Sequence, residues 1–294
     1  MSHRLGIGFC LHADLDYLSA AREILEDEAD FFEVNPETMW RLDDGALVRN
    51  DYHDLYRQIL ERSGKPFVAH GLNFSVGTPL EGDEPRTEAW LARLRDDHET
   101  FRFAWLSEHL GWTTLGGLQG VLPLPLPITD EAVSAVATRM RRLSAVVPTV
   151  AFENNVTYFA LGDPEQEPEF FNSICRAAHC GLLLDLHNVH TQCRNFGLNP
   201  LEYLDRIALE HVIEIHLSGG SESDPRWLSS RRVFRLDTHD HAVPEEVWRL
   251  LAHALPRCVN LRGIVVERLN GTFGPGELPA LRGELRRARE LWPS

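Results

Sequence analysis

Eight short apolar runs alternate with eight amphipathic stretches along the chain, and this alternation constrains the fold more than any other feature. Runs such as Leu182–Leu184 and Ile264–Val266 are apolar on both faces, as strands are in a parallel sheet covered by helices. Eight units favour closure into a barrel, and no G-x-G-x-x-G pattern follows the first run to indicate a dinucleotide-binding sheet. The predicted strands are Leu5–Phe9, Phe31–Val34, Pro66–Leu72, Trp105–Leu110, Thr149–Phe152, Gly181–Leu186, His211–Leu217 and Gly263–Val266.

The stretches between these runs predict helices. Thr129-Asp130-Glu131 is a capping pattern, and Pro244 stands where proline suits a first helical turn. No internal repeat or low-complexity linker interrupts the 294 residues, a length normal for an α/β barrel. We therefore expect a single domain, residues 1–294, folded as a (β/α)8 TIM barrel. The predicted helices are Leu15–Glu28, Tyr52–Arg62, Thr87–Ala104, Thr129–Leu143, Pro168–His179, Pro200–Leu209, one that begins at Pro244, and Leu278–Leu291.

Six consecutive predicted strands end in His, Asp or Glu. The carboxyl ends of all strands in a (β/α)8 barrel meet at one rim, where the active sites of such enzymes lie. We therefore expect these side chains to converge. They are His70, Glu108, His109, Glu153, Asp185, His187, Asn188, His216 and Glu267, with Asp237 and His239 in the segment after the seventh strand.

Converging carboxylates and imidazoles are costly to bury unless a cation binds them. Mixed His and carboxylate ligands suit Fe, Mn or Zn better than Ca or Mg, and their number exceeds what one ion takes. Glu153 is central in the set and could bridge two ions. A lone histidine at a strand end is more often a hydrogen-bonded structural residue, so the prediction of a metal centre depends on the whole set.

Several residues stay open at this stage. Glu33 ends the second run and is either a rim residue or a solvated carboxylate. His12 lies beyond the end of the first run, which makes a place at the rim the less favoured reading. His190 follows the Asp185–Asn188 segment and is ambiguous.

Charge and cysteine content narrow the functional classes. The net charge of −15 argues against nucleic acid and against an anionic membrane surface as partners. No apolar run approaches the roughly 20 residues that span a bilayer. The five cysteines are odd in number, irregularly spaced and without a C-x-x-C pair, which indicates free thiols in a cytoplasmic protein.

Taken together, the motifs resemble those of the DUF692 family, also called multinuclear non-heme iron-dependent oxidative enzymes. They occur in the family's order and cover most of the chain, and the set is far more specific than any single motif. The matching segments are His70–Gly77, Ser107–Leu110, Leu122–Pro125, Glu153–Tyr158, Leu183–Val189, Glu214–Gly219, Asp237–His239 and Val266–Arg268.

The resemblance implies a xylose-isomerase-like barrel that holds two or three iron ions and uses dioxygen as co-substrate. It also implies oxidative modification of a side chain, often cysteine, in a ribosomally synthesised precursor peptide. A small partner protein that recognises the leader of that peptide is expected as well. The metal ligands implied by position are His70, His109, Glu153, Asp185, Asn188, His216, Asp237, His239 and Glu267.

The sequence departs from the family pattern at three places. Glu108 stands where the family usually has Asp, and His187 where it commonly has Asn. The segment Gly8–His12 lacks the Arg that often follows the family's first strand. These differences bear on the substrate more than on the metal.

The expected function is therefore iron- and dioxygen-dependent oxidation of a peptide, with Glu108 or His187 as the candidate general base. Two alternatives remain open. One is a zinc- or manganese-dependent isomerase or hydrolase on the same barrel, because multi-metal sites also suit in-line displacement. The other is a metal-binding protein without catalytic activity.

Overall fold

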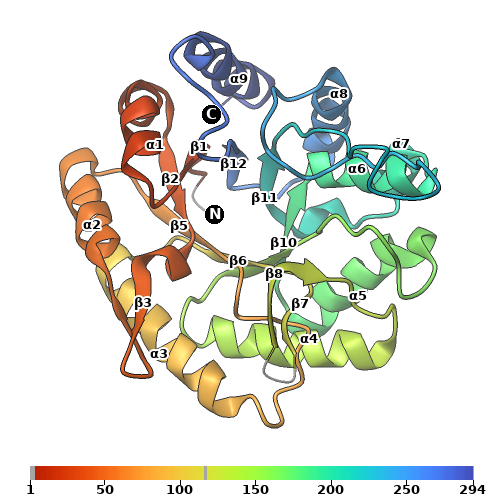
Figure 1. Ribbon diagram of the computed structural model, residues 1–294, viewed down its shortest axis with the longest axis horizontal. Coiled ribbons are helices and arrows are strands. Elements are labelled where there is room, and N and C mark those ends of the chain that lie inside the picture. The colour runs from red at the N-terminus through yellow and green to blue at the C-terminus, as the bar shows by residue number, and fades with distance from the viewer. Residues whose placement is uncertain (1–3, 116–117, 294) are drawn as a thin grey trace.

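The computed structural model describes residues 4–115 and 118–293, which form a closed barrel of eight parallel strands in the order β1-β12-β11-β10-β9-β6-β5-β2. Helices surround the strands as an outer layer (Figure 1). The predicted (β/α)8 fold is confirmed, and each of the eight predicted strands corresponds to a barrel strand. These are β1 (Gly6–Leu11), β2 (Phe31–Val34), β5 (Phe67–Gly71), β6 (Leu106–His109), β9 (Val150–Glu153), β10 (Gly181–Asp185), β11 (Val212–Leu217) and β12 (Gly263–Val266).

The helices begin and end with ordinary capping chemistry. Thr129 accepts a hydrogen bond from the Ala132 amide at the start of α4, and Gly64 and Gly197 end α2 and α6 in the left-handed conformation. The helices are α1 (Leu15–Ala20), α2 (Asp51–Ser63), α3 (Glu84–Phe101), α4 (Asp130–Ser144), α5 (Glu167–Ala178), α6 (Leu186–Phe196), α7 (Pro200–Asp205), α8 (Glu245–Ala254) and α9 (Leu278–Leu291).

The structure corrects three predicted boundaries. The first predicted helix is broken into α1 and a π-helical turn, Ile24–Glu28. Strand β1 extends two residues further than predicted, to Leu11. Helix α6 was not predicted, because Asp185 both ends β10 and caps α6: its Oδ1 accepts a hydrogen bond from the Asn188 amide at 2.6 Å, so no loop separates the strand from the helix.

Two β-hairpins lie in the loops after β2 and β6. They are β3 (Trp40–Asp43) with β4 (Ala46–Arg49), and β7 (Trp112–Leu115) with β8 (Leu118–Leu124). The first turns at Asp44-Gly45, where both residues have positive φ, a strong hairpin signal. The prediction missed both hairpins because their strands are short and partly polar.

Large apolar side chains fill the barrel interior below the predicted rim. Phe31 and Trp105 pack edge to face there, with ring centroids 5.6 Å apart. Gly8 and Gly263 make room for them, because a Cβ at either position would lie within 2.7 Å of the Phe31 ring. The layer comprises Phe31, Val68, Trp105, Ala151, Leu183, Ile213 and Val265. It forms a dry floor beneath the carboxyl ends of the strands.

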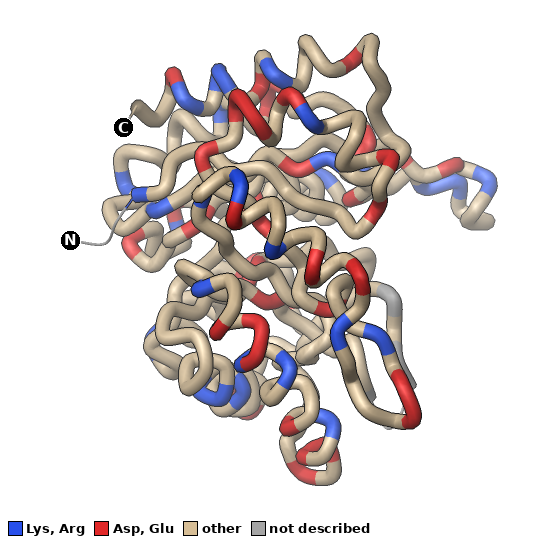
Figure 2. Tube along the Cα trace, turned by 90° about the vertical axis from the view of Figure 1, so that its left-hand side faces the viewer, with Lys and Arg blue, Asp and Glu red and all other residues tan. Residues whose placement is uncertain are grey.

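The outer surface carries charges of both signs. Figure 2 shows acidic and basic residues interspersed along the outer elements of the trace, in keeping with a net charge of −15 made of 44 acidic and 29 basic residues. In the described part of the chain, no helix is long and apolar enough to cross a membrane.

Candidate metal centre

The alternation of inward-facing and outward-facing residues along the strands explains why predicted ligands lie at the mouth of the barrel. Successive residues of a strand face opposite sides, so the residue two positions after an inward-facing one also faces inward. Five floor residues are followed in this way by an ionisable side chain: Phe31 by Glu33, Val68 by His70, Ala151 by Glu153, Leu183 by Asp185, and Val265 by Glu267. The ionisable residues therefore form the next layer above the floor.

Glu153 joins two histidines from neighbouring strands. Its Oε2 lies 3.2 Å from His70 Nε2 and 3.1 Å from His109 Nε2. The other nitrogen of His109, Nδ1, lies 2.9 Å from the carbonyl oxygen of Gly71, which can only accept a hydrogen bond. His109 Nδ1 is therefore the donor, and Nε2 presents a lone pair toward Glu153, as a metal-ligating histidine does.

A second group forms around Glu267 at the end of β12. Its Oε2 lies 3.1 Å from His216 Nδ1 and 3.7 Å from His239 Nδ1. His239 Nε2 in turn lies 2.7 Å from Asp237 Oδ1. The long segment after β11 thus bends back over the barrel and delivers two of the predicted ligands.

Asn188 and Asp185 close the gap between these groups. Asn188 Nδ2 donates to Glu153 Oε1 at 3.2 Å and to the carbonyl oxygen of Asn154 at 3.0 Å, so its Oδ1 is left over for another partner. Asp185 shares a group of mutually close donor atoms with His239 and Glu267. All nine residues implied as ligands by the family resemblance are therefore brought together in one cluster.

Several buried atoms of this cluster that could bind a metal have no hydrogen-bond partner among the described residues. A buried polar atom without a partner is destabilising, and at a ring of carboxylate oxygens the natural partner is a cation. The atoms are Glu153 Oε2, Asp185 Oδ2, Asn188 Oδ1, His216 Nδ1 and Glu267 Oε2. The donor set of the cluster therefore fits a metal.

The donor atoms divide into overlapping groups. Three sets of side chains each bring three possible ligand atoms within 4.8 Å of one another: His70, Glu153 and His216; Glu33, His216 and Glu267; Asp185, His239 and Glu267. His216 and Glu267 each belong to two sets. Shared donors of this kind suit a centre with more than one ion.

Burial shifts the pKa values of several ionisable side chains in the cluster. Burial raises the pKa of Glu153 to about 7 and lowers the pKa of His70 to about 4. Burial, followed by the negative charge of Asp237, raises the pKa of Asp185 well above its usual range. Without a cation these groups are driven toward their neutral forms.

The cluster is closed on one side and open on the other. The side chains of His216 and Asp185 are fully buried, whereas those of His109 and Asp237 are 23% and 26% exposed. The open side faces the mouth of the barrel. The cluster is therefore accessible to solution beside His109 and Asp237.

The two predicted base residues do not line this opening. Glu108 alternates with His109 and faces the helix layer, where its Oε2 accepts a hydrogen bond from the Phe74 amide at 3.3 Å. The structure therefore does not bring Glu108 into the cluster. His187 is fully buried behind Asp237, with Nδ1 3.3 Å from Asp237 Oδ1.

The structure also shows where Glu33 and His12 lie, two residues whose location the sequence left undecided. Glu33 joins the cluster, with Oε2 3.0 Å from His216 Nε2. His12 follows the lengthened β1 directly, and its Nε2 lies 3.5 Å from Cys10 Sγ and 3.1 Å from the carbonyl oxygen of Arg268. Glu33 could have been found from the sequence, because it stands two residues after an aromatic floor residue.

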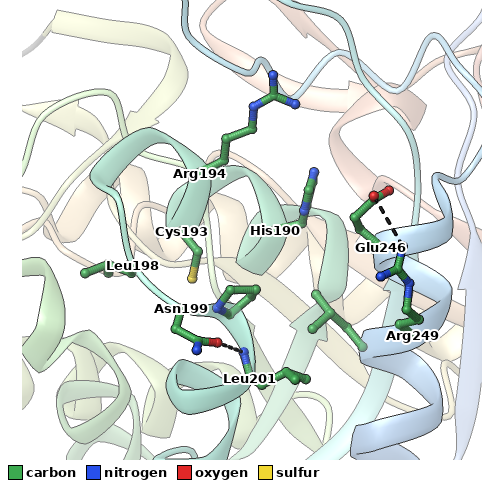
Figure 3. Close-up of a pocket in the computed structure, with 10 residues that line it drawn as sticks. His190, Cys193, Arg194, Leu198, Asn199, Leu201, Glu246 and Arg249 are labelled. Carbon is green, nitrogen blue, oxygen red and sulfur yellow. Dashed lines mark hydrogen bonds and ion pairs between the residues drawn. The ribbon is translucent and has the colours of Figure 1, made fainter.

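His190 does not belong to the cluster. It lines a hollow of about 310 Å³ in the helix layer, between the α6–α7 segment and α8 (Figure 3). Cys193 and Leu198 line the same hollow, with Glu246 and Arg249 on its α8 side. This hollow is separate from the mouth of the barrel.

The fold and the cluster define a xylose-isomerase-like barrel with a candidate metal centre at its mouth. Similar solved structures include a xylose isomerase domain protein from Planctomyces limnophilus (TM-score 0.60, 14% identity, 99% of this chain and 98% of that chain). A sugar phosphate isomerase/epimerase from Parabacteroides distasonis is also similar (TM-score 0.58, 11% identity, 99% and 96%). At these identities the likeness concerns the fold alone.

Sequence comparison gives the family. The chain belongs to the family described as RiPP precursor modification enzyme MbnB/TglH/ChrH, whose model matches residues 4–292. A UPF0276 protein from Anaeromyxobacter sp. is 36% identical over 67% of this chain and 66% of its own length. Another from Rhizorhabdus wittichii is 34% identical over 81% of this chain and 80% of its own length. The predicted family is confirmed.

Proposed function

We propose that this protein is an iron-dependent enzyme that uses dioxygen to modify a side chain, with cysteine as the first candidate, in a ribosomally synthesised precursor peptide. The observation that supports it best is the cluster of nine predicted ligands, in which five buried carboxylate, amide and imidazole atoms have no hydrogen-bond partner among the described residues. Membership in a family that modifies precursor peptides supports the class of substrate. The mixed His and carboxylate donors are consistent with iron.

Two or three ions are the expected occupancy, because the nine predicted ligands include two separate groups of close ligand atoms: His70, Glu153 and His216, and Asp185, His239 and Glu267. Glu153 and Glu267 are the carboxylates that would hold the ions together with the neighbouring histidines. His70 and His109 lie beside Glu153, and His216 and His239 lie beside Glu267. The predicted ligands lie on several barrel strands and on the segments that follow them, and the rigid barrel fixes their relative positions.

Iron bound here would supply dioxygen activation, a chemistry that protein side chains do not provide. The residues of the chain position the reactants. The apolar floor and the buried side keep water out, while the partly exposed His109, Asp237 and His239 leave an approach for a peptide side chain. His187 holds Asp237 in place from behind. We assign no proton transfer to Glu108, since its carboxylate is turned away from the opening.

Exposed apolar side chains around the mouth support a peptide as the substrate. They stand on the segments that follow β2, β6, β9, β11 and β12, at the same end of the barrel as the metal centre. Examples are Leu42, Leu122, Phe159, Trp227 and Leu269.

A partner and a compartment complete the proposal. A small protein that recognises the leader of the precursor peptide would present the peptide to this mouth. We place the enzyme in the cytoplasm, where the peptide is made and where cysteines such as the five free ones of this chain stay reduced.

The test uses the protein reconstituted with Fe(II) without oxygen and mixed with a precursor peptide encoded beside its gene, with any small protein encoded there. On admission of dioxygen, we expect oxygen uptake together with a changed mass of the peptide. Glu153→Ala should abolish both, because it removes the carboxylate that joins His70 and His109.

Glu37→Gln is the matched control. Glu37 lies on the same side of the barrel, and its Oε1 accepts hydrogen bonds from the amides of Leu72 and Asn73, a role that a glutamine oxygen retains. This variant should keep full activity. An iron-loaded protein that neither consumes oxygen nor changes the peptide would contradict the proposal.

A further inference from the structure

Glu33 contributes a buried carboxylate that the nine predicted ligands do not include. It stands at the third position of β2, it is 3% exposed, and its Oε2 lies 3.0 Å from His216 Nε2. His216 is itself fully buried. The pair therefore interacts without competition from water.

The two ring nitrogens of His216 face two different carboxylates. Nε2 has a hydrogen bond with Glu33, whereas Nδ1 lies 3.1 Å from Glu267 Oε2 and has no hydrogen bond within the described part of the chain. A neutral imidazole has one N–H group and one lone pair. With the proton on Nε2, Glu33 accepts it, and the lone pair of Nδ1 points to the region of Glu267.

A lone pair directed at a carboxylate oxygen is unfavourable unless a cation lies near both. Glu267 Oε2 also lacks a hydrogen bond from the described residues, and Glu267 is a residue of two of the three groups of possible ligands. Nδ1 of His216 and Oε2 of Glu267 are therefore the pair that faces an ion. Glu33 lies on the opposite edge of the imidazole ring.

We infer that Glu33 is a positioning residue of the metal centre: it accepts the Nε2–H of His216 and so holds Nδ1 free to bind an ion together with Glu267. Carboxylates that hold a ligating histidine in this way fix both its tautomer and its ring orientation, and they raise its basicity. The inference rests on the proposed metal centre and adds to it a residue that acts through His216.

The geometry favours this role over direct ligation by Glu33. Its Oε2 is already engaged by His216 Nε2, and a second carboxylate, Glu214, lies 3.9 Å from the same nitrogen. Glu214 in turn accepts a hydrogen bond from Trp105 Nε1 at 2.8 Å. The Nε2 edge of the ring thus faces two carboxylates, of which Glu33 lies within hydrogen-bond distance, whereas the Nδ1 edge faces Glu267 Oε2 alone.

The test measures Fe(II) affinity in the absence of oxygen and peptide, by competition of the metal-free protein with a chromophoric chelator. Glu33→Leu should weaken binding by about 10- to 100-fold, the usual effect of removing such a partner. Glu33→Gln should lose clearly less, because its amide oxygen still accepts the Nε2–H. Glu37→Gln is the matched control and should bind as the wild type does.

Each outcome decides a separate point. Equal affinity of Glu33→Leu and wild type would overturn the positioning role. An equal, large loss in Glu33→Gln and Glu33→Leu would overturn it in favour of direct ligation, because an amide is a poor substitute for a carboxylate ligand. Absence of Fe(II) binding by the wild type would instead refute the proposed function. Thermal unfolding of the metal-free variants shows whether each is folded.

Discussion

Asn188 shows how a single side chain links structure and metal chemistry in this protein. Its backbone amide is capped by Asp185, and its side-chain amide donates to Glu153, so both ends of the residue are fixed. What remains is Oδ1, buried and without a partner among the described residues. The residue that caps α6, Asp185, and the candidate ligand Asn188 thus lie in the same short segment.

Replacement of Asn188 by alanine should weaken metal binding by about 10-fold or more, because it removes both the free oxygen and the hydrogen bond that orients Glu153. The fold should persist, since Asp185 still caps the helix through the backbone amide. Chelator competition gives the affinity, and circular dichroism gives the helix content. Undiminished affinity would show that Asn188 Oδ1 binds no ion.

Cys10 is the residue that β1 contributes beside the cluster. Burial alone would raise the pKa of its thiol, but the adjacent His12 lowers that pKa below its usual value. Burial raises the pKa of Cys193 and of Cys258 to about 12. We predict that iodoacetamide alkylates Cys10 faster than Cys193 or Cys258 in the metal-free protein, as followed by mass spectrometry.

His12→Gln is the control for that difference, because it removes the imidazole while keeping a polar side chain. The rate at Cys10 should fall in this variant, and the rates at Cys193 and Cys258 should stay the same. Alkylation of Cys10 no faster than that of Cys258 in the wild type would contradict the assigned effect of His12.

At the scale of elements, the sequence predicts the barrel strands well because most of them are short buried apolar runs, and five have a floor residue followed two positions later by an ionisable rim residue. The same rule, applied to Phe31, would have identified Glu33, and Glu214 shares an inward face with His216. Helix α6 could not be separated from β10 because Asp185 serves both. The convergence of Asp237 and His239 depends on the long segment after β11, whose path no periodicity reveals; only their position after the seventh predicted strand and the family motif indicate them.

The contact between the π-helical turn and α9 gives a prediction at this scale. The hydrogen bond from Arg286, opposed by burial and supported by Arg282, holds the pKa of Glu28 below its usual value. A lowered pKa in the folded state means that the carboxylate stabilises the fold above its unfolded pKa of about 4.3, and that this contribution disappears as the pH falls through the folded value.

Glu28→Gln should therefore lower the free energy of unfolding at pH 7 by about 1 kcal/mol, with a smaller difference at pH 3. Urea unfolding at both pH values measures it. Glu26→Gln, which breaks only an exposed pair with Arg22, should show little change at either pH. An equal loss for Glu28→Gln at pH 3 and pH 7 would show that the charge of Glu28 is not the cause.

At the scale of the whole molecule, a metal centre with ligands on several barrel strands and on the segments that follow them would stabilise the folded barrel. An ion that binds only the folded state stabilises it by about 2.7 kcal/mol at a concentration 100 times its dissociation constant. We expect Fe(II), added without oxygen, to raise the unfolding temperature of the metal-free protein by several degrees, and a chelator to reverse the shift.

Glu153→Ala provides the comparison, because its unfolding temperature should respond weakly to Fe(II). An identical shift in the wild type and in Glu153→Ala would place the bound ion elsewhere. Loss of secondary structure on chelation, rather than a lower unfolding temperature, would show that the barrel does not form without metal.

The central claim is that the cluster at the barrel mouth holds more than one iron ion. Elemental analysis of the protein purified without oxygen tests it most directly, with Glu153→Ala and His216→Ala prepared alongside. We predict more than one iron per chain in the wild type, lost together in both variants. Stoichiometric zinc or manganese with little iron, after growth in iron-replete medium, would contradict the claim and favour an isomerase or hydrolase instead.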